Sequence, residues 1–412
     1  MINYIDLFCG IGGFHQAIEK ICQERDIECK CRFACDFDEY ASKVYENNYK
    51  MKAHYDLTKE ETHKVLEEKL DGVDLTFLFA GFPCQPFSKA GNREGFSNKT
   101  KGTLFFEIQK IATKYKPKYI LLENVRNLEK HDNGETWNTI RNTLCECGYI
   151  VDHAILSPNE IGTTPALRDR IFITCYRKDL SYKDDFKLIS QENHEKKETS
   201  IYRYGNIENG LKKQYFDTGS APDIEENKVK TIDMWNELVK ELKKREIHII
   251  SPMWPKYFDE KIDISDFPDW KKNIIYRNRK FYSENKELYD KWYIKNKEHF
   301  DSLIESDKKF EWNAGDKIND IWEGIIQFRP SGVRVKKPDF IPTLVAINQT
   351  PILGAERRYL KPTEMARLYG FKNLDFGNQN KKETYKQLGN TVSVDVVEYV
   401  IKHMLDGTDY RG

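Results

Sequence analysis

The sequence has no long apolar run and no surplus of one charge. No stretch reaches eighteen consecutive apolar residues, so it offers no membrane-spanning helix. The N-terminus, MINYIDLFCG, lacks a basic region followed by a cleavable apolar segment, and we expect a cytoplasmic protein without membrane contact. Lysine plus arginine and aspartate plus glutamate both number 66, so any nucleic-acid surface must be a local patch.

Metal ligands in a typical spacing are also missing. The pairs Cys29-x-Cys31 and Cys145-x-Cys147 have one intervening residue, which is shorter than the spacing in zinc knuckles. The nine histidines include no His-x-x-x-His pair. An odd number of cysteines, nine, in a chain without a signal peptide favours reduced thiols. We therefore predict no metal site.

The sequence does contain short apolar segments that alternate with helical patterns. Strand character is found in YIDLF, CRFAC, DLTFLFAG, PKYILLENV and RIFITCYR. This alternation predicts an α/β fold with a doubly wound, mostly parallel, Rossmann-like sheet. In such sheets ligands bind at the carboxyl ends of the strands. The unusual residues of the sequence fall at those ends: Gly10 to Gly13, Asp36, Cys84 and Glu123.

The composition changes near residue 180. A mostly polar stretch follows, and TIDMWNELVKELKKREI then has the spacing of an amphipathic helix. Residues 270–300 mix basic and aromatic side chains at near-helical spacing, which favours helical packing over a base-reading surface. Alternation of strands and helices resumes near residue 345. We predict a catalytic domain over 1–180, a smaller inserted domain over 181–345 and a return to the first domain over 346–412.

A glycine-rich turn follows the first predicted strand. The three glycines of DLFCGIGGF permit positive φ and close approach of the backbone to a ligand. A dinucleotide fingerprint would need a small residue where His15 stands, so the turn favours a nucleoside cofactor without a pyrophosphate. Asp36 can bind ribose hydroxyls and Phe37 can stack on a base. S-adenosylmethionine has these chemical features.

A single cysteine lies between two prolines in GFPCQPFS. Cys84 follows a predicted strand, where backbone N–H groups lower the pKa of a thiol. Glu123 follows about one strand–helix–strand unit later, and burial would raise the pKa of its carboxyl so that it can donate a proton. A thiolate and an acid suit cytosine, because attack at carbon 6 with protonation at N3 makes carbon 5 nucleophilic.

The motifs, in this order, resemble the DNA (cytosine-5)-methyltransferases of bacterial restriction–modification systems. The matching blocks are DLFCGIGGF, GFPCQPFS, GTLFFEI, ENV, RDRIFI, RRYLKPTEMARLYGF and YKQLGNTVSVDVVEYV. The resemblance implies methylation of carbon 5 of a flipped-out cytosine in a specific duplex DNA sequence. It also implies S-adenosylmethionine as cofactor, S-adenosylhomocysteine as product and no metal. The protein is then expected to be a nucleoid-associated bacterial monomer, with a cognate restriction endonuclease that acts on the same site without contacting it.

Position by position, the resemblance also implies the site residues. Cys84 is the nucleophile that forms a covalent adduct at carbon 6, and Glu123 contacts N3 and the exocyclic amine. Arg170 contacts the O2 atom of the base, and Arg168 helps to hold the loop or a backbone phosphate. The implied cofactor site comprises Phe8, Gly10, Gly12, Gly13, Asp36, Phe37, Asp56, Leu57, Pro83, Leu104, Asn390 and Val392.

Two positions depart from the family pattern. Ala166 stands where glutamine is common, and Cys9 stands where alanine is usual. We expect altered loop contacts at Ala166 and a structural, unreactive thiol at Cys9. The inserted region would be the target-recognition domain, in which RPSGVRVKK is the strongest groove-reading candidate. The predicted DNA-binding residues are Ser88, Arg329, Arg334, Lys336 and Lys337.

Two alternatives share parts of this pattern. A tRNA cytosine-5 methyltransferase has the same blocks but carries a Cys-Phe-Thr tripeptide in a short recognition region. This sequence has no such tripeptide and a long insert, which favours DNA. A catalytically inactive DNA-binding relative is the other alternative. Such proteins tend to lose the Pro-Cys pair or the glutamate, and both are present here.

Overall fold

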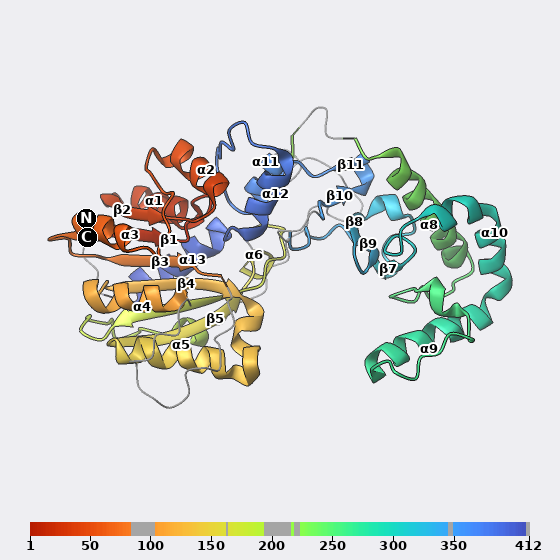
Figure 1. The fold of residues 1–412 in the computed structure, drawn as a ribbon, viewed down its shortest axis with the longest axis horizontal. Coiled ribbons are helices and arrows are strands. Elements are labelled where there is room, and N and C mark those ends of the chain that lie inside the picture. The colour runs from red at the N-terminus through yellow and green to blue at the C-terminus, as the bar shows by residue number, and fades with distance from the viewer. Residues whose placement is uncertain (84–103, 162–163, 193–215, 218–222, 345–348, 409–412) are drawn as a thin grey trace. The chain divides into compact units, whose positions relative to one another are not determined.

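The computed structural model describes residues 1–83, 104–161, 164–192, 216–217, 223–344 and 349–408. It divides into two compact units, each built from segments that are separate in the sequence (Figure 1). The first unit comprises Met1–Thr199, Thr343–Ala346 and Met365–Gly412, and the second comprises Ser200–Pro342 and Ile347–Glu364. Compared with the predicted boundaries, residues 347–364 group with the second unit and not with the C-terminal segment.

A six-stranded sheet forms the centre of the first unit, in the order β2-β1-β3-β4-β6-β5. The pairings of β1 with β2 and β3, and of β3 with β4, are parallel, whereas β6 is antiparallel to both β4 and β5. All strands except β6 therefore point the same way, which confirms the predicted α/β, mostly parallel fold. The strands are β1 (Ile2–Leu7), β2 (Cys29–Cys35), β3 (Phe77–Gly81), β4 (Tyr119–Val125), β5 (Tyr149–Leu156) and β6 (Arg170–Arg177).

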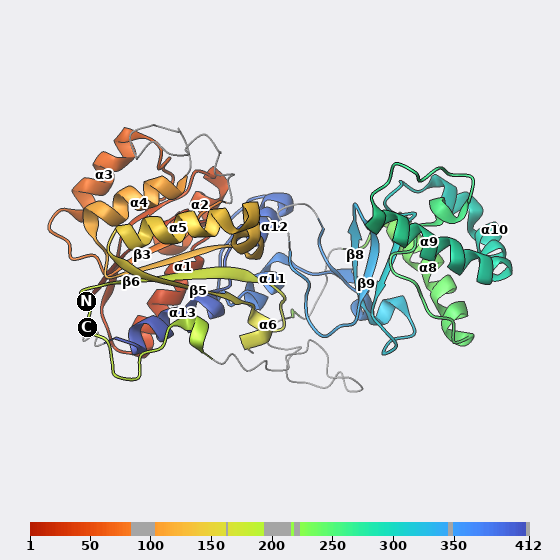
Figure 2. The same ribbon diagram turned by 90° about the horizontal axis from the view of Figure 1, so that it is seen from below.

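Helices cover both faces of this sheet (Figure 2). Apolar side chains of α3, α4 and α5 form one core with the sheet, while Phe14 of α1 stacks on Phe79 from the opposite face and α13 packs beside α1. The helices are α1 (Gly13–Glu24), α2 (Glu39–Tyr49), α3 (Glu60–Leu70), α4 (Leu104–Tyr115), α5 (Glu135–Glu146), α6 (Pro158–Ile161), α11 (Pro362–Leu368), α12 (Lys381–Asn390) and α13 (Val394–Asp406).

Strand register brings the functional motifs to one edge of the sheet. Leu7, the last residue of β1, is paired with Cys35 at the end of β2 and with Ala80 near the end of β3. Gly81, which ends β3, is paired with Glu123 on β4. The segments that follow β1, β2 and β3 therefore start side by side with Glu123, as expected for a doubly wound sheet.

The second unit combines a small sheet with three long helices. The sheet has the order β11-β10-β8-β9-β7. Its strands are β7 (Phe310–Asn313), β8 (Ile325–Arg329), β9 (Gly332–Lys336), β10 (Ile352–Leu353) and β11 (Arg358–Tyr359), and the helices are α8 (Glu226–Lys244), α9 (Asp269–Glu284) and α10 (Lys286–Ser302). Trp235 of α8 is fully buried and stacks on Phe310 of β7, with ring centroids 5.0 Å apart.

Two predictions for this region have different outcomes. The predicted amphipathic helix is α8, and the aromatic–basic stretch forms the packed helices α9 and α10, so both helical predictions are confirmed. Alternation of strands and helices was expected to resume only near residue 345, and this was wrong, because strands β7, β8 and β9 follow the helices before that residue. These strands have four or five residues each, which is too short to give a clear alternating pattern.

Candidate active site

The turn between β1 and α1 has a backbone that suits glycine. Phe8, Gly10 and Gly12 have φ values of 56°, 53° and 89°, in the left-handed region. A Cβ atom on Gly12 would lie 2.1 Å from the Tyr49 ring, whereas one on Gly10 would meet no atom within 4 Å. The turn is therefore tightly packed at Gly12 and open at Gly10, where a ligand can approach the backbone.

Asp36, directly after β2, is hydrogen-bonded to this turn. Its Oδ2 accepts from the backbone N–H of Gly10 at 2.8 Å, and its Oδ1 accepts from the backbone N–H of Asp38 at 2.8 Å. Burial raises the pKa of Asp36, and the two backbone hydrogen bonds oppose that shift. Each carboxylate oxygen keeps a further lone pair for a ligand hydroxyl. The next side chain, Phe37, is 75% exposed at the same edge.

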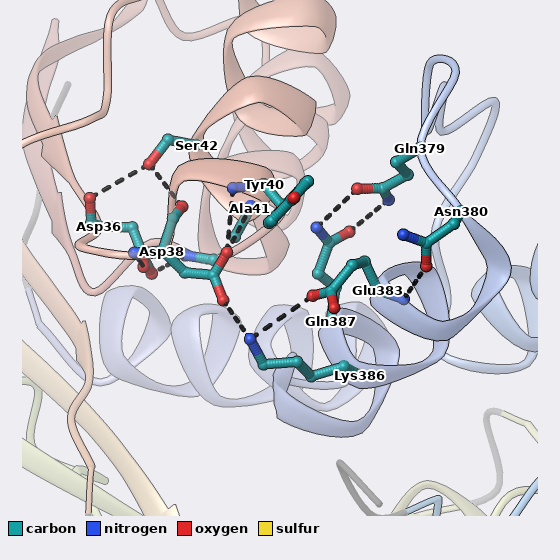
Figure 3. Close-up of polar contacts among 11 residues, drawn as sticks. Asp36, Asp38, Tyr40, Ala41, Ser42, Gln379, Asn380, Glu383, Lys386 and Gln387 are labelled. Carbon is teal, nitrogen blue, oxygen red and sulfur yellow. Dashed lines mark hydrogen bonds and ion pairs between the residues drawn. The ribbon is translucent and has the colours of Figure 1, made fainter. Parts of the chain in front are cut away.

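An ion pair joins the N-terminus of α2 to helix α12 (Figure 3). Asp38 caps α2 by accepting from the backbone N–H groups of Tyr40 and Ala41, and it also accepts from Lys386 Nζ at 2.7 Å. Burial acts to raise the pKa of Asp38, but the Lys386 ammonium and the two backbone donors lower it overall. Sequence analysis missed this contact, since the two residues lie 348 positions apart.

The end of α12 lies against the glycine turn. Asn390, its last residue, is exposed, and Val392 is buried. A Cβ atom on Gly13 would lie 2.4 Å from Cγ2 of Val392, so these two predicted cofactor residues are in contact. Within the segment, the side chains of Gln379 and Gln387 exchange hydrogen bonds of 2.7 and 2.9 Å (Figure 3). This exchange fixes the position of α12 relative to the residues before it.

The remaining predicted cofactor residues differ in exposure. Asp56 accepts hydrogen bonds from the side chain and backbone N–H of Thr58 at 2.7 and 2.9 Å, and these bonds lower its pKa. Leu57 is 3% exposed and belongs to the core, and Leu104 is partly buried at the start of α4. Pro83 is exposed. Of this group, only Pro83 has a largely accessible side chain.

Glu123 forms a buried pair with Arg170. The Nε atom of Arg170 lies 2.9 Å from Oε1 of Glu123, which is 6% exposed. Burial raises the pKa of Glu123, although both Arg170 and Arg168 act to lower it. Burial, and then the charge of Arg168, lowers the pKa of Arg170 to about 10. The other oxygen, Oε2, faces Gly81, where an added Cβ atom would lie 3.6 Å away.

Arg168 is buried away from solvent. It is 2% exposed, its Nη2 donates to the carbonyl oxygen of Gly389 at 3.1 Å, and its guanidinium lies 5.0 Å from the centre of the Tyr369 ring. Its Nε and Nη1 atoms have no hydrogen-bond partner among the described residues. Arg168 therefore ties the segment just before β6 to the end of α12, immediately before Asn390.

Sequence reasoning missed a residue that fixes the backbone before Cys84. Asn124 is 3% exposed, and its Nδ2 donates to the carbonyl oxygen of Phe82 at 2.9 Å. The signal was present in the ENV block, where this asparagine follows Glu123. Cys84 and Ser88 themselves lie outside the described residues. The bond holds the chain two residues before the predicted nucleophile.

The two residues that depart from the family pattern are both buried. Cys9 is 4% exposed, and burial raises the pKa of its thiol well above the usual value. A protonated, inaccessible thiol is unreactive. Ala166 is fully buried, and its carbonyl oxygen accepts from the backbone N–H of Asn159.

The other predicted DNA-binding residues lie on or directly after strands of the second unit's sheet. Arg329 ends β8, while Arg334 and Lys336 are on β9. Lys337 follows β9, and its Nζ lies 2.9 Å from Oδ2 of Asp339. Across the part of the chain that the structure describes, no cluster of histidine, cysteine, aspartate or glutamate could hold a metal ion. Every helix in that part is too short or too polar to span a bilayer.

Comparisons with known proteins cover nearly the whole chain. A profile of the family described as C-5 cytosine-specific DNA methylase matches residues 2–406. Type II methyltransferase M.AluI of Cellulosimicrobium cellulans is 30% identical, with 97% of this chain and 91% of the relative aligned. M.BanI of Aneurinibacillus aneurinilyticus is 27% identical over 98% and 95% of the two chains. M.HhaI of Haemophilus parahaemolyticus is 39% identical over 44% of this chain and 50% of its own.

A solved structure supports the fold. A prophage-encoded E. coli protein, assigned as a DNA modification methyltransferase, aligns over 99% of both chains with a TM-score of 0.52 and 20% identity. This likeness concerns the fold alone. The family assignment depends on the profile match and on the relatives aligned over nearly their full length. The protein belongs to the C-5 cytosine-specific DNA methylase family.

Proposed function

We propose that this protein is the modification enzyme of a type II restriction–modification system and methylates carbon 5 of a cytosine in a specific duplex DNA sequence. The type II methyltransferases to which it is similar support this assignment. The observation that carries it is the buried Glu123–Arg170 pair. This pair lies at the sheet edge that also holds the glycine turn and the backbone leading to Cys84.

The residues around the glycine turn suit S-adenosylmethionine. The open space at Gly10 admits a ligand close to the backbone, and Asp36 beside it can accept hydrogen bonds from ribose hydroxyls. The exposed ring of Phe37 would stack on the adenine. Asn390 and Val392 would close the methionine end. When bound, this cofactor supplies an electrophilic methyl group, and S-adenosylhomocysteine is the product.

Glu123 and Cys84 would activate the target base together. The Cys84 thiolate would form a bond to carbon 6 of a flipped-out cytosine while Glu123 donates a proton to N3, which makes carbon 5 nucleophilic. After methylation, water would take the carbon-5 proton, the sulfur–carbon bond would break to release the Cys84 thiolate, and N3 would return its proton to the Glu123 carboxylate, which restores the ring. Because burial raises the pKa of Glu123, its carboxyl retains a proton to a higher pH than an exposed glutamate does.

Arg170 would position this acid and contact the base. Its Nε pairs with Oε1 of Glu123, which leaves Oε2 for the cytosine. Its Nη1 donates to the carbonyl oxygen of Asp169, and its Nη2 donates to no acceptor among the described residues. We infer that Nη2 donates to O2 of the base. Arg168 would act at a distance, by holding the segment that ends in Asn390.

The inserted region would serve as the target-recognition domain. We propose that it reads the bases around the target cytosine and that the enzyme acts on duplex DNA as a bacterial, nucleoid-associated cytoplasmic monomer. A cognate restriction endonuclease would cut the same unmethylated sequence without contacting this protein.

Transfer of tritium from labelled S-adenosylmethionine to duplex DNA and, separately, to bulk tRNA tests the function. The wild type should label DNA, and Cys84→Ala should abolish labelling. Cys145→Ala is a matched control, because Cys145 is a partly exposed thiol on α5, away from the proposed site. Cofactor binding should persist in both variants.

Each of the other outcomes would indicate a different function for this protein. Labelling of tRNA alone would indicate an RNA methyltransferase. No labelling of either substrate, with the cofactor still bound, would indicate an inactive relative. Labelling of DNA by Cys84→Ala at the wild-type rate would exclude Cys84 as the nucleophile.

A further inference from the structure

The sheet of the second unit has one apolar and one polar face. Phe310, Val333 and Ile326 belong to the core that contains Trp235 of α8, and the alternate residues of the same strands point the other way. On that polar side, Arg334 of β9 is paired with Glu311 of β7 and with Gln327 of β8. These three side chains, here called the polar row, cross three adjacent strands.

Glu311 links two arginines. Its Oε2 accepts from Nε of Arg334 at 2.5 Å and lies 3.9 Å from Nη1 of Arg329. Glu311 is only 8% exposed, whereas the side chains of Arg334 and Arg329 are 28% and 27% exposed. One carboxylate therefore faces two guanidinium groups, and the polar row together with Arg329 has a positive balance that favours an electron-rich partner.

Both arginines keep unused donors. No hydrogen bond from the two Nη atoms of Arg334 is recorded among the described residues. Nη1 of Arg329 is buried without a hydrogen-bond partner in the same set, and its Nε makes a long contact of 3.3 Å with Oε1 of Gln349. Because Nε of Arg334 is held by Glu311, the plane of its guanidinium is fixed and its free donors are oriented together.

We infer that Glu311 is a positioning residue that aims Arg334 at the O6 and N7 acceptors of a guanine in the recognition sequence. The inference rests on the proposed function. A guanidinium donates two parallel hydrogen bonds to this edge of guanine, which no other base offers. A phosphate contact needs only charge and reach, which long exposed side chains supply. Arg334 is instead partly buried, fixed by a carboxylate and placed beside the 3%-exposed Gln327.

Methylation of a duplex library with randomised sequence, followed by bisulfite sequencing, tests this inference. The wild type gives the recognition sequence. Arg334→Lys keeps the positive charge but removes the two parallel donors of the guanidinium. We therefore expect the preference for G·C over other base pairs at one position to fall by about 10- to 100-fold, while the preferences at other positions are kept. Glu311→Gln should relax the same pair, and the double variant should relax it little further, because the two residues act as one unit.

Arg245→Lys provides the matched control. Arg245 is another arginine of the second unit, near a glutamate on α8, and the change should leave the sequence preference intact. Circular dichroism and thermal unfolding would confirm that each variant is folded. If Glu311→Gln does not fold, Glu311→Asp replaces it, and a folded Glu311 variant that keeps the wild-type preference while Arg334→Lys loses it would exclude the positioning role of Glu311.

Three results would overturn the inference. If Arg334→Lys retains the wild-type sequence preference, Arg334 does not contact a base. An equal loss of activity on all sequences, with a weaker salt dependence of DNA binding, would indicate a phosphate contact. If the wild-type protein labels no DNA, both the proposed function and this inference are wrong. Because the wild type is assayed first, this failure is distinguished from a failure of the inference alone.

Discussion

The carboxylates of the proposed catalytic site and the arginines in or beside the polar row are held differently. In the first unit, Glu123 is paired with Arg170, Asp36 with the glycine turn, and Asp38 with both a helix N-terminus and Lys386. In the second unit, Arg329 and Arg334 share the single carboxylate of Glu311 and keep donors that the described residues leave unused.

This difference separates two tasks. Groups that are already paired are preorganised, and they suit chemistry that must be the same on every substrate. Donors without a partner are satisfied only when the right acceptor arrives, and they suit discrimination between substrates. We therefore expect changes in the first unit to lower activity on all DNA sequences and changes in the polar row to alter which sequences are chosen.

The largest effect is expected from Glu123→Gln. The change removes the proposed proton donor, so kcat should fall by about 10²- to 10⁴-fold on every sequence without altering sequence preference. Burial raises the pKa of Glu123, so wild-type activity should decline as pH rises through that value, and the variant should lack this decline. Single-turnover kinetics over a range of pH would measure both effects.

The free energy of unfolding should depend on pH through the same titration of Glu123. The folded state binds the Glu123 proton more tightly than the unfolded state, so the stabilisation is present below the unfolded pKa and is lost as pH rises through the folded pKa. Glu129→Gln is the control, since this carboxylate is partly exposed and contacts His153. Full activity of Glu123→Gln, or a shifted sequence preference, would contradict the division between the two units.

A smaller but distinct effect is expected from Trp235→Ala. Trp235 is fully buried, stacks on Phe310 and donates from Nε1 to the carbonyl oxygen of Asp307 at 3.1 Å. Its loss should destabilise the second unit by about 3–5 kcal/mol while cofactor binding by the first unit persists. Thermal unfolding measured with and without cofactor would show whether the unfolding temperature changes for the second unit alone or for both units.

Trp270→Ala is the comparison for that experiment. Trp270 is 62% exposed on α9 of the same unit, and its removal should change the unfolding temperature little. A parallel loss of cofactor affinity in Trp235→Ala would show that the two units do not unfold independently.

The smallest effect is expected from Lys386→Met. The ion pair with Asp38 is partly exposed and screened, so its loss should cost less than about 1 kcal/mol of stability. Because the pair links α12 to the segment after Asp36, KM for the cofactor should rise by up to about fivefold, with kcat nearly unchanged. Wild-type KM should rise with salt, and the KM of the variant should not.

Lys43→Met tests whether this effect is specific. Lys43 also pairs with a carboxylate on α2, Glu39, but both side chains point to solvent. The KM of this control for the cofactor should match that of the wild type. An unchanged KM in Lys386→Met would mean that the position of α12 does not depend on the ion pair.

The sequence was a good guide where local pattern determines structure. Five strands of the first sheet were predicted because each is a short apolar segment before a turn, and helices α8, α9 and α10 were predicted from their spacing. Strand β5 was missed, because its buried and partly buried residues only partly alternate. Strands β7 to β9 were missed because such short segments carry little periodicity.

The candidate site was predicted only in part, for a related reason. Motifs identified Glu123, Arg170, the glycine turn and Asp36 from neighbouring residues. They did not identify Asn124 as the residue that holds Phe82, or Lys386 and Glu311 as partners of Asp38 and Arg334. Each of those contacts joins segments that are distant in the sequence.

The sequence by itself determined the family and the kind of chemistry, because both follow from the order of the motifs and the residue types within them. Only the tertiary structure decided which polar groups are paired. Strand order, register and helix packing place Gly13 against Val392 and Arg168 against Gly389. They also bury Glu123 beside Arg170 while leaving donors of Arg334 unused. Burial and pairing set the pKa of Glu123 and the direction of a guanidinium, and both depend on neighbours that meet only in the folded chain.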